Sequence, residues 1–319
     1  MPFLKLTSLK IFNSIDEFQT TKKTIVTIGT FDGVHLGHQK IIRKLNANAK
    51  FYHCESLILT FFPHPRMVLQ PESDIQLLNT IEERSQLLEK AGLDNLIIHP
   101  FDKSFSELSA EDFVKKILVD KLKIKKIVIG HDHRFGKNRA ANIDDLIVFG
   151  EKYDFEVEQI SVQELDEVSI SSTKIRNALT QGDIILANGF LGFPYFLTGI
   201  VQKGKQLGRT IGFPTANIKI EENYKLIPRK GVYIVCSYIE SKMYYGLMNI
   251  GTNPTVEGKN LSVEVYYLDF DSDLYNKKIE VSLLYYIRPE QKFDSFDLLK
   301  NQIESDKNFA IQYISNNLK

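Results

Sequence analysis

The segment TIVTIGTFDGVHLGH, residues 24 to 38, carries the pattern from which the fold of the first half of the chain is predicted. Its opening residues, Thr24 to Gly29, form an apolar run of the length expected for a buried strand. A turn containing Gly33 follows, and the segment then continues into a helix. We therefore expect a strand, a glycine-bearing turn and a helix in direct succession.

Similar short apolar runs recur as far as about residue 180, at residues 56 to 62, 95 to 99 and 126 to 130. Amphipathic stretches separate them, and two open with a hydroxyl three residues before a carboxylate, Thr80 before Glu83 and Ser109 before Asp112. Strands that alternate with helices indicate an α/β fold with a doubly wound parallel sheet. Ligands of such sheets bind beyond the carboxyl ends of the strands.

After about residue 190 the pattern becomes that of antiparallel strands. In KKIEVSLLYYI, residues 277 to 287, every odd position from Ile279 to Ile287 is apolar, which is the period of a strand with one buried face. Further strand-like runs are joined by Gly, Asn and Pro turns, and they occur at residues 231 to 239, 243 to 251 and 262 to 270. This half is predicted to be a mainly antiparallel β-barrel.

A C-terminal helix is predicted from Ser295 to about Asn317. Its candidate buried stripe consists of four apolar residues, Phe296, Leu299, Ile303 and Phe309. The domain junction is expected between Gln181 and Pro194, which gives two domains, residues 1–186 and residues 187–319.

The composition restricts the kinds of partner that the chain can have. Forty basic and forty acidic residues give a formal net charge of zero, which argues against a nucleic-acid partner. The first residues lack the apolar core of a signal peptide, and no later apolar run reaches the roughly 20 residues of a membrane span. Cys54 and Cys236 lie outside any C-x-x-C pattern, so neither a disulfide nor a zinc site is indicated. We expect a cytoplasmic protein, a monomer or weak homo-oligomer, without a membrane partner.

His35 and His38 are the first candidates for chemistry. They are three residues apart at the predicted start of a helix, so they share a face where free backbone N–H groups and the helix dipole attract phosphate. Gly37 lets a phosphate approach the backbone closely. This arrangement suits a transfer in which negative charge builds on a nucleotide α-phosphate and pyrophosphate leaves. Metal ligation and a purely structural role remain alternatives.

These residues resemble the signature of the H-x-G-H nucleotidyltransferases, and nearly the whole chain is similar to the bacterial bifunctional riboflavin kinase/FAD synthetases. Four N-terminal motifs occur in the order of that family: residues 29 to 38, 62 to 65, 130 to 139 and 170 to 176. The resemblance implies that the first domain is a nucleotidyltransferase that adenylylates FMN to FAD with ATP and Mg²⁺, with His35 and His38 as catalytic residues.

The resemblance also implies a set of binding residues in the first domain. It assigns contacts with ATP phosphates to Gly29, Phe31, Gly37, Ser171, Ser172, Thr173 and Arg176. It assigns contacts with flavin to Phe62, Pro63, His64, Pro65, Asp132 and Arg134. Without it, the Phe62-to-Pro65 segment is a strand-ending turn, the hydroxyls before Arg176 are helix caps, and Asp132 and Arg134 are a surface ion pair.

Two positions depart from the family pattern. His133 stands where the family commonly has phenylalanine in D-F-R-F-G, and Ala141 stands where a glycine is usual. We expect these differences to affect flavin fit and loop conformation more than phosphate chemistry.

In the second half, residues 199 to 206 approach the phosphate-binding P-loop pattern, but Gln206 replaces the required Ser or Thr. Two glycines and a proline follow where that pattern needs a helix, so a P-loop is rejected. The residues instead resemble the signature G-x-x-x-G-R-x-x-G-x-P-T-A-N of riboflavin kinases. The resemblance implies contacts with ATP phosphates by Gly204, Gly208, Arg209, Gly212, Thr215 and Asn217.

The same resemblance implies three further roles in the kinase half. Thr215 and Asn217 would contact the Mg²⁺ that accompanies ATP. Glu264 matches the catalytic carboxylate, which would accept the proton of the ribityl 5′-hydroxyl as it attacks the γ-phosphate. Arg288 would help to bind flavin or nucleotide. From spacing alone, Glu264 is an exposed strand residue and Arg288 a residue that caps a strand.

Three functional hypotheses are compatible with these motifs. In the first, riboflavin is phosphorylated to FMN and FMN is then adenylylated to FAD. In the second, the kinase is kept but the first domain uses another nucleotide or substrate. In the third, the chain is a flavin-binding regulator without turnover.

Overall fold

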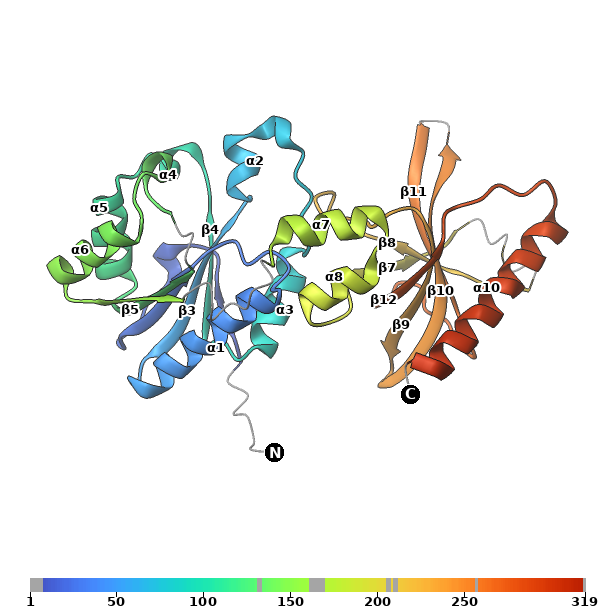
Figure 1. Cartoon of the computed structure of the whole chain (residues 1–319), viewed down its shortest axis with the longest axis horizontal. Helices are drawn as coiled ribbons and strands as arrows, with labels where there is room; N and C mark the ends of the chain where they lie inside the picture. Colours follow the sequence, from blue (N-terminus) through green and yellow to red (C-terminus); the bar gives the residue numbers. More distant parts are fainter. Residues whose placement is uncertain are drawn as a thin grey trace. The chain divides into compact units, whose positions relative to one another are not determined.

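The structure is a computed structural model that describes residues 8–130, 134–160, 170–204, 208, 212–255 and 258–317. The chain divides into two compact units, Met1–Ser171 and Ser172–Lys319. The first is an α/β unit and the second is a barrel with helices, as Figure 1 shows for each unit taken by itself. The predicted fold class is confirmed for both halves.

The first unit contains a parallel six-stranded sheet in the order β1-β4-β3-β2-β5-β6. Its strands are β1 Lys10–Phe12, β2 Thr24–Ile28, β3 Glu55–Phe62, β4 Asn95–Pro100, β5 Ile124–Gly130 and β6 Glu156–Ile160. Its helical segments are η1 Ile15–Glu17, α1 Leu36–Phe51, α2 Pro65–Leu69, η2 Pro71–Ser73, α3 Ile81–Lys90, α4 Lys103–Ser106, α5 Ala110–Asp112, η3 Phe113–Lys121, η4 Lys137–Arg139 and α6 Ile143–Tyr153. The four apolar runs singled out in the sequence form β2, β3, β4 and β5.

Helices cover both faces of this sheet because successive strand residues point to opposite sides. Ile25 and Ile58 pack in one cluster with side chains of α1 and α3, and Val26 and Leu57 pack in a second cluster with side chains of η3 and α6. Figure 1 shows α1 and α3 on one side of the strands and α5 and α6 on the other. The chain is therefore doubly wound, and its loops gather at the two ends of the strands.

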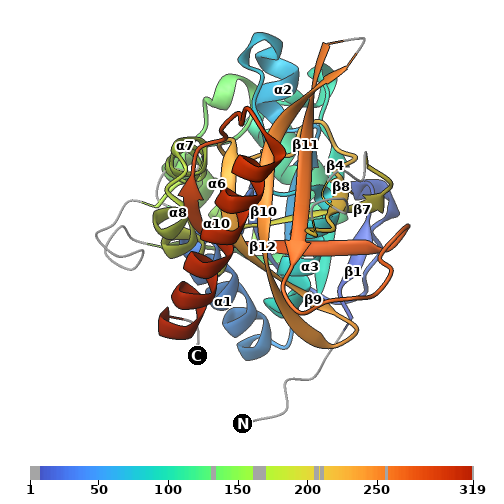
Figure 2. The same cartoon turned by 90° about the vertical axis from the view of Figure 1, so that its right-hand side faces the viewer.

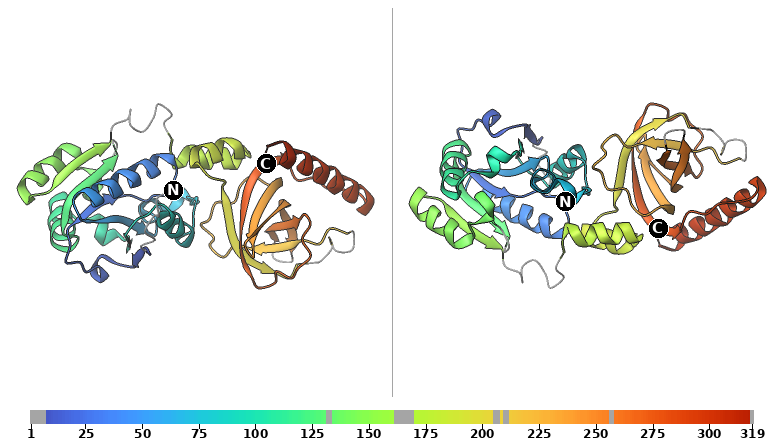
Figure 3. Two further views of the ribbon diagram at one scale, coloured as in Figure 1. Left: turned by 90° about the horizontal axis from the view of Figure 1, so that it is seen from below. Right: turned by 90° about the horizontal axis from the view of Figure 1, so that it is seen from above.

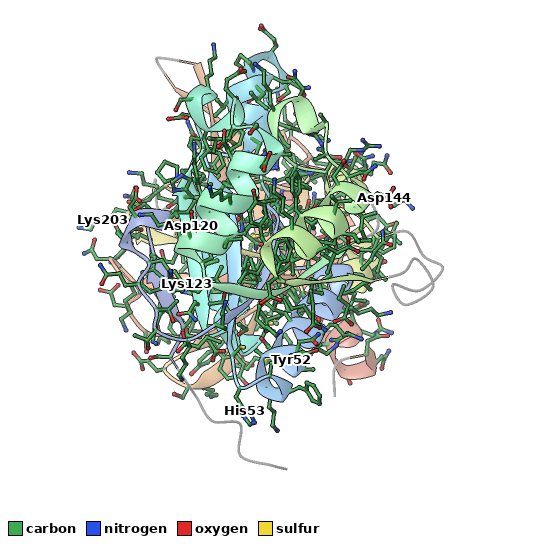
Figure 4. The ribbon with its side chains drawn as sticks, turned by 90° about the vertical axis from the view of Figure 1, so that its left-hand side faces the viewer. Tyr52, His53, Asp120, Lys123, Asp144 and Lys203 are labelled. Carbon is green, nitrogen blue, oxygen red and sulfur yellow. The ribbon has the colours of Figure 1, made fainter. Side chains whose placement is uncertain are left out.

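Both predicted helix starts are confirmed. The Thr80 hydroxyl accepts a hydrogen bond from the Glu83 N–H at 3.1 Å, and the Thr80 N–H donates to the Glu83 carboxylate at 2.9 Å. Ser109 accepts from the Asp112 N–H at 3.0 Å. At the opposite end of the sheet, Figure 4 shows Tyr52 and His53 beyond the end of α1.

The second unit contains a closed barrel of antiparallel strands in the order β10-β11-β8-β7-β12-β9. The strands are β7 Phe196–Gln202, β8 Ala216–Lys219, β9 Gly231–Ile239, β10 Lys242–Thr255, β11 Gly258–Tyr267 and β12 Lys278–Arg288. The helices are α7 Ser172–Gln181, α8 Ile184–Leu191 and α10 Phe296–Asn317. Figure 3 shows the barrel with α10 along its outside. The domain boundary expected between residues 186 and 187 stays a prediction. In the structure α7 belongs to the compact unit that contains the barrel, which begins at Ser172.

Strand β12 follows the predicted alternation only in its first part. Ile279, Val281 and Leu283 are buried inside the barrel, but the register with β9 shifts between Leu283 and Tyr285 and again before Arg288. After the first shift Tyr285 packs with α10 rather than inside the barrel. A bulge reverses the faces of the residues that follow it, and a strict period of two cannot reveal this.

Helix α10 has nearly the predicted bounds, but the predicted buried stripe was partly wrong. Phe296 and Phe309 remain 62% and 42% exposed, whereas Asp306 and Ala310 are buried. Ala310 packs against β9 and β10 residues, including Val232, where α10 crosses the barrel in Figure 2. Within the described part of the chain, no helix has both the length and the apolar character needed to cross a membrane.

Candidate functional site

The predicted phosphate-binding residues of the first unit come together at the carboxyl end of β2. His35 caps α1, and its Nδ1 accepts a hydrogen bond from the His38 N–H at 3.4 Å. The two imidazole rings stack with centroids 3.7 Å apart, and the Phe31 ring packs on His38 at 4.8 Å. Gly29 begins the loop and Gly37 lies between the histidines, where an added Cβ would come within 3.3 Å of the His35 ring. The loop is therefore packed around the pair of imidazoles.

His38 carries an unusual electrostatic environment. Burial lowers its pKa well below the ordinary value, and electrostatic interactions with His35 and with Arg84 lower this pKa further. The imidazole is accordingly neutral near pH 7. Its Nδ1 atom is buried and has no hydrogen-bond partner among the described residues. A neutral ring nitrogen is thus available to a group of the substrate.

Asp32 and Arg84 are parts of this site that sequence reasoning missed. Asp32 is buried, and its carboxylate accepts hydrogen bonds from the backbone N–H groups of Leu78 at 3.0 Å and Asn79 at 3.2 Å. The Arg84 guanidinium lies 3.6 Å from the same carboxylate, and both side chains are at most 2% exposed. The position of Asp32 inside the histidine motif was the available signal, but Arg84 on α3 had none.

The predicted flavin-binding residues follow neighbouring strands of the same sheet. Phe62 ends β3, and His64 caps α2 by accepting a hydrogen bond from the Arg66 N–H at 3.1 Å. Pro63 is exposed and Pro65 half-buried between these elements. The carboxyl ends of β2, β3 and β5 lie at one edge because these strands are adjacent and parallel. These loops therefore belong to the same end of the sheet as the histidines.

The segment after β5 is only partly described. Asp132 and His133 lie outside the described residues, and Arg134 is exposed. Phe135 and Ala141 form a two-way backbone bridge at 3.1 and 3.2 Å, and both side chains are buried in one apolar cluster. The Ala141 methyl group therefore fills core space at the position where a glycine is usual.

The hydroxyl-rich motif begins α7, as predicted. Ser171 precedes the helix, and Ser172, Thr173 and Arg176 lie in its first turns. Ile175 in this helix is fully buried. Contact of these residues with phosphate stays a prediction.

The predicted kinase residues of the second unit converge on the barrel wall. Thr215 donates a hydrogen bond from its hydroxyl to the Glu264 carboxylate at 3.1 Å. Asn217 on β8 and Asn249 on β10 are the register partners of Glu264 on β11. Three neighbouring elements thus place a hydroxyl, a carboxylate and amides together.

The glycines of the motif permit close packing around these groups. A Cβ on Gly204 would come within 2.6 Å of the Asn217 side chain, and one on Gly208 would collide with the Phe213 carbonyl. Gly212 has φ +89°, a conformation that favours glycine. Arg209 lies outside the described residues. Gly199 lies within β7 rather than in a loop, but residues 205–207 and 209–211 lie outside the described residues, so the rejection of a P-loop stays a prediction.

A cavity of about 270 Å³ opens beside Glu264. Gly208, Thr215 and Glu264 line one part of it, together with Arg288. The rest of its wall is largely apolar, with Phe213, Val232, Leu247, Met248, Phe293, Phe296, Leu299 and Ile303, and it also includes Asn249, Tyr266, Glu290, Gln291 and Asp306. The cavity is thus largely apolar and includes several polar groups, as expected for a site that binds a flat ring system.

Arg288 is held by a buried carboxylate of α10. Its Nε donates to the two oxygens of Asp306 at 3.0 and 3.1 Å, and one terminal nitrogen donates at 2.7 Å. Gln302 also donates to Asp306 at 2.9 Å. Sequence reasoning missed Asp306, whose signal was an acidic residue within the apolar stripe of the helix.

The oxygen-rich group around Glu264 fits the chemistry of Mg²⁺. Hydroxyl, amide and carboxylate oxygens are the ligand types that this ion prefers. Thr215 is within hydrogen-bond distance of Glu264, and Asn217 lies opposite it on the next strand. Among the described residues, no group of three or more His, Cys, Asp or Glu side chains could hold a metal ion.

The chain is similar to known proteins along nearly its whole length. The FAD synthetase family model matches residues 17–174, and the riboflavin kinase family model matches residues 191–314. The bifunctional riboflavin kinase/FMN adenylyltransferase of Listeria monocytogenes is 38% identical over 92% of this chain and 92% of its own length. Those of Haemophilus influenzae and Escherichia coli K12 are 40% and 36% identical over 88% and 91% of this chain and 91% and 92% of their own lengths.

A solved structure has the same fold. A crystal structure described as a macrolide-efflux protein from Streptococcus pneumoniae has a TM-score of 0.86 and 30% identity, over 98% of this chain and 99% of that one. The whole-length curated relatives carry both activities in their names. Of the three hypotheses, these names support the first, in which both flavin reactions occur. They do not support a different substrate for the first domain or a regulator without turnover.

Proposed function

The chain belongs to the family of bifunctional riboflavin kinase/FMN adenylyltransferases, and from this premise we propose which residues carry each reaction. The enzyme phosphorylates riboflavin to FMN and adenylylates FMN to FAD. The assignment of residues rests on one observation: each unit contains its own polar group. The first unit has the stacked histidines, and the second has the Thr215–Glu264 pair.

In the kinase reaction, Glu264 is the general base. Its carboxylate accepts the proton of the ribityl 5′-hydroxyl as that oxygen attacks the γ-phosphorus of ATP and ADP leaves. Thr215 orients the carboxylate through its hydrogen bond. The apolar cavity between the barrel and α10 receives the isoalloxazine ring, with Arg288 at its edge. Gly204, Gly208, Arg209 and Gly212 form the loop that contacts the ATP phosphates.

Mg²⁺ is proposed to enter with ATP beside Thr215 and Asn217. Bound there, it supplies positive charge that balances the phosphate oxygens. The protein contributes neutral oxygens, which suits an ion held mainly by the nucleotide.

In the adenylylation reaction, His35 and His38 bind the phosphates of ATP at the N-terminus of α1. A phosphate oxygen of FMN attacks the α-phosphorus and pyrophosphate leaves. The imidazole N–H groups and the helix N-terminus stabilise the negative charge that develops. Further phosphate contacts are proposed for Gly29, Phe31 and Gly37, for Ser171, and for the α7 residues Ser172, Thr173 and Arg176. Flavin contacts are proposed for residues 62 to 65, Asp132 and Arg134.

A mixing experiment tests this division of roles. His38→Ala is expected to convert riboflavin to FMN but no further, and Glu264→Gln is expected to adenylylate only FMN that is supplied. Neither variant alone makes FAD from riboflavin, whereas a mixture of the two does, as followed by chromatography of the flavins. Efficient FAD formation from riboflavin by either single variant would contradict the assignment.

Riboflavin, FMN and ATP are the small-molecule substrates that follow from the two activities. We propose a cytoplasmic enzyme that is a monomer or weak homo-oligomer and has no nucleic-acid partner. Light scattering after size-exclusion chromatography at two protein concentrations tests the oligomeric state.

A further inference from the structure

The ion pair of Asp32 and Arg84 is the strongest feature that the two reactions leave unexplained. Both side chains are almost completely buried in the first unit, beside the histidine motif. Burying two charges costs several kcal/mol per ion, and replacing such a pair by apolar residues is often neutral or stabilising. A buried pair next to catalytic groups therefore suggests a role in the reaction rather than in stability alone.

Asp32 joins two loops of the site. It belongs to the loop between β2 and α1, and it accepts N–H bonds from Leu78 and Asn79 in the loop before α3. Asn79 and Leu78 are themselves buried, so these N–H groups have no access to water. The preceding residue, Phe31, packs its ring on His38. Fixing Asp32 therefore helps to fix the neighbouring Phe31 ring that packs on His38.

Arg84 supplies the charge of this arrangement. It stands in the first turns of α3, whose start is fastened by the capping box of Thr80 and Glu83. The pKa of His38 is lowered mainly by burial, and also by electrostatic interactions with His35 and with the positive charge of Arg84. Two titratable groups thus act on His38: His35, which caps α1, and Arg84 on α3, against which the Asp32 carboxylate lies.

We infer that Asp32 and Arg84 are a positioning pair for adenylylation, in which Asp32 fastens the loop that carries the histidines and Arg84 sets the charge beside His38. This inference rests on the proposed role of His38 as a phosphate-binding catalytic residue. The pair does not touch substrate in this account, and it acts through the histidine.

The decisive measurement is the titration of the His38 imidazole by NMR, which needs no substrate. The seven histidines of the chain can be labelled at the ring carbon, and His38→Gln identifies the His38 signal. Arg84→Met removes the positive charge, so the titration midpoint of His38 is expected to move to higher pH by about half a unit to one unit. Arg84→Lys keeps the charge and is expected to leave the midpoint close to that of the natural protein.

Asp32→Asn distinguishes an electrostatic effect of Arg84 on His38 from a general loosening of the packing around His38. It removes the negative charge of Asp32 and keeps the positive charge of Arg84, so the titration midpoint of His38 is expected to stay or to move to lower pH. If either substitution merely exposed His38 to water, the titration midpoint of His38 would move to higher pH, towards the ordinary histidine value, in both Arg84→Met and Asp32→Asn. That result, or a midpoint unchanged in Arg84→Met, overturns the inference.

Activity gives the second arm of the test. Arg84→Met is expected to slow FAD formation from FMN by about tenfold, while FMN formation in the barrel unit stays unchanged and Arg84→Lys remains within about threefold. Arg43→Met, the same change at an exposed arginine of α1, is the matched control and is expected to alter neither reaction. Full adenylylation activity in Arg84→Met overturns the inference, whereas full adenylylation activity in His38→Ala would instead overturn the proposed function.

Discussion

The two units build a phosphate-handling site in different ways. In the first unit Asp32 and His35 stand on the loop after β2 and His38 on the first turn of α1, and hydrogen bonds to the buried Asp32 carboxylate join that loop to the loop before α3. In the second unit the carboxylate stands on a strand, so its neighbours follow from the register of β8, β10 and β11. Loop geometry needs additional anchors, whereas strand register positions a side chain through the backbone ladder itself.

This difference predicts where each site is sensitive. A site on a strand should lose activity when its functional group changes, and it should tolerate changes in the loops of the other unit. A site on loops should be sensitive to residues that touch no substrate, such as Asp32 and Arg84. Because both reactions occur in one chain, each serves as a control for the other.

The largest expected effect is on the strand-borne carboxylate. Glu264→Gln is predicted to slow FMN formation by about a thousandfold, since a general base contributes factors of this size. Adenylylation of supplied FMN should be unaffected. The matched control is Glu280→Gln, also a half-buried glutamate on a barrel strand, which should keep both activities. A kinase that is equally sensitive to both changes would contradict the role of Glu264.

The next effect concerns the anchor of α10. Asp306→Ala leaves the largely buried Arg288 without its carboxylate, which should destabilise the barrel unit by about 3 kcal/mol and raise the KM for riboflavin. Urea unfolding followed by circular dichroism measures the stability, because the chain has no tryptophan. Ser305→Ala, at an exposed neighbouring position, is the control. Unchanged stability with an unchanged KM would show that the ion pair does not hold the cavity wall.

A smaller effect tests the packing of the phosphate loop. The methyl group of Gly204→Ala would overlap the Asn217 side chain, so this side chain must shift from its present place on the strand residue that pairs with Glu264. FMN formation should fall by about tenfold, about 1.4 kcal/mol, with adenylylation unchanged. Gly189→Ala on α8, where an added Cβ meets nothing within 4 Å, is the control. An equal loss of FMN formation in both variants would contradict this explanation.

The smallest effect concerns the departure at Ala141. Ala141→Gly removes a buried methyl group and adds backbone freedom, so the first unit should lose about 1 kcal/mol of stability. FAD formation should be unchanged, because the methyl group lies in the core. Thermal unfolding compared with Ala140→Gly, at the exposed neighbouring position, measures the difference. A clear change in FAD formation would assign Ala141 to the site instead.

Much of each site was predictable because the relevant signals are local. His35 and His38 belong to one helix start, so short-range spacing identified them, and residues 204 to 217 form one continuous motif, which the resemblance to the riboflavin kinase signature identified. The capping residues Thr80 and Ser109 were predictable for the same reason. Glu264 was identified by resemblance, since a glutamate on a strand has no distinctive spacing.

Other features depended on contacts between distant segments. The exposed Phe296 and Phe309 and the buried Asp306 follow from where α10 meets the barrel, and its periodicity does not specify which side does so. The change of face after Leu283 follows from how β12 pairs with β9.

By itself the sequence determined the order of strands and helices along the chain, the presence of two units, and the motifs that handle phosphate. These features depend on residues that are close together in the chain. Only the tertiary structure decided that Asp32 pairs with Arg84 and that Arg288 pairs with Asp306. Burial makes those pairs consequential, since a charge removed from water requires a partner. That partner is selected by packing, and packing depends on how the elements are assembled.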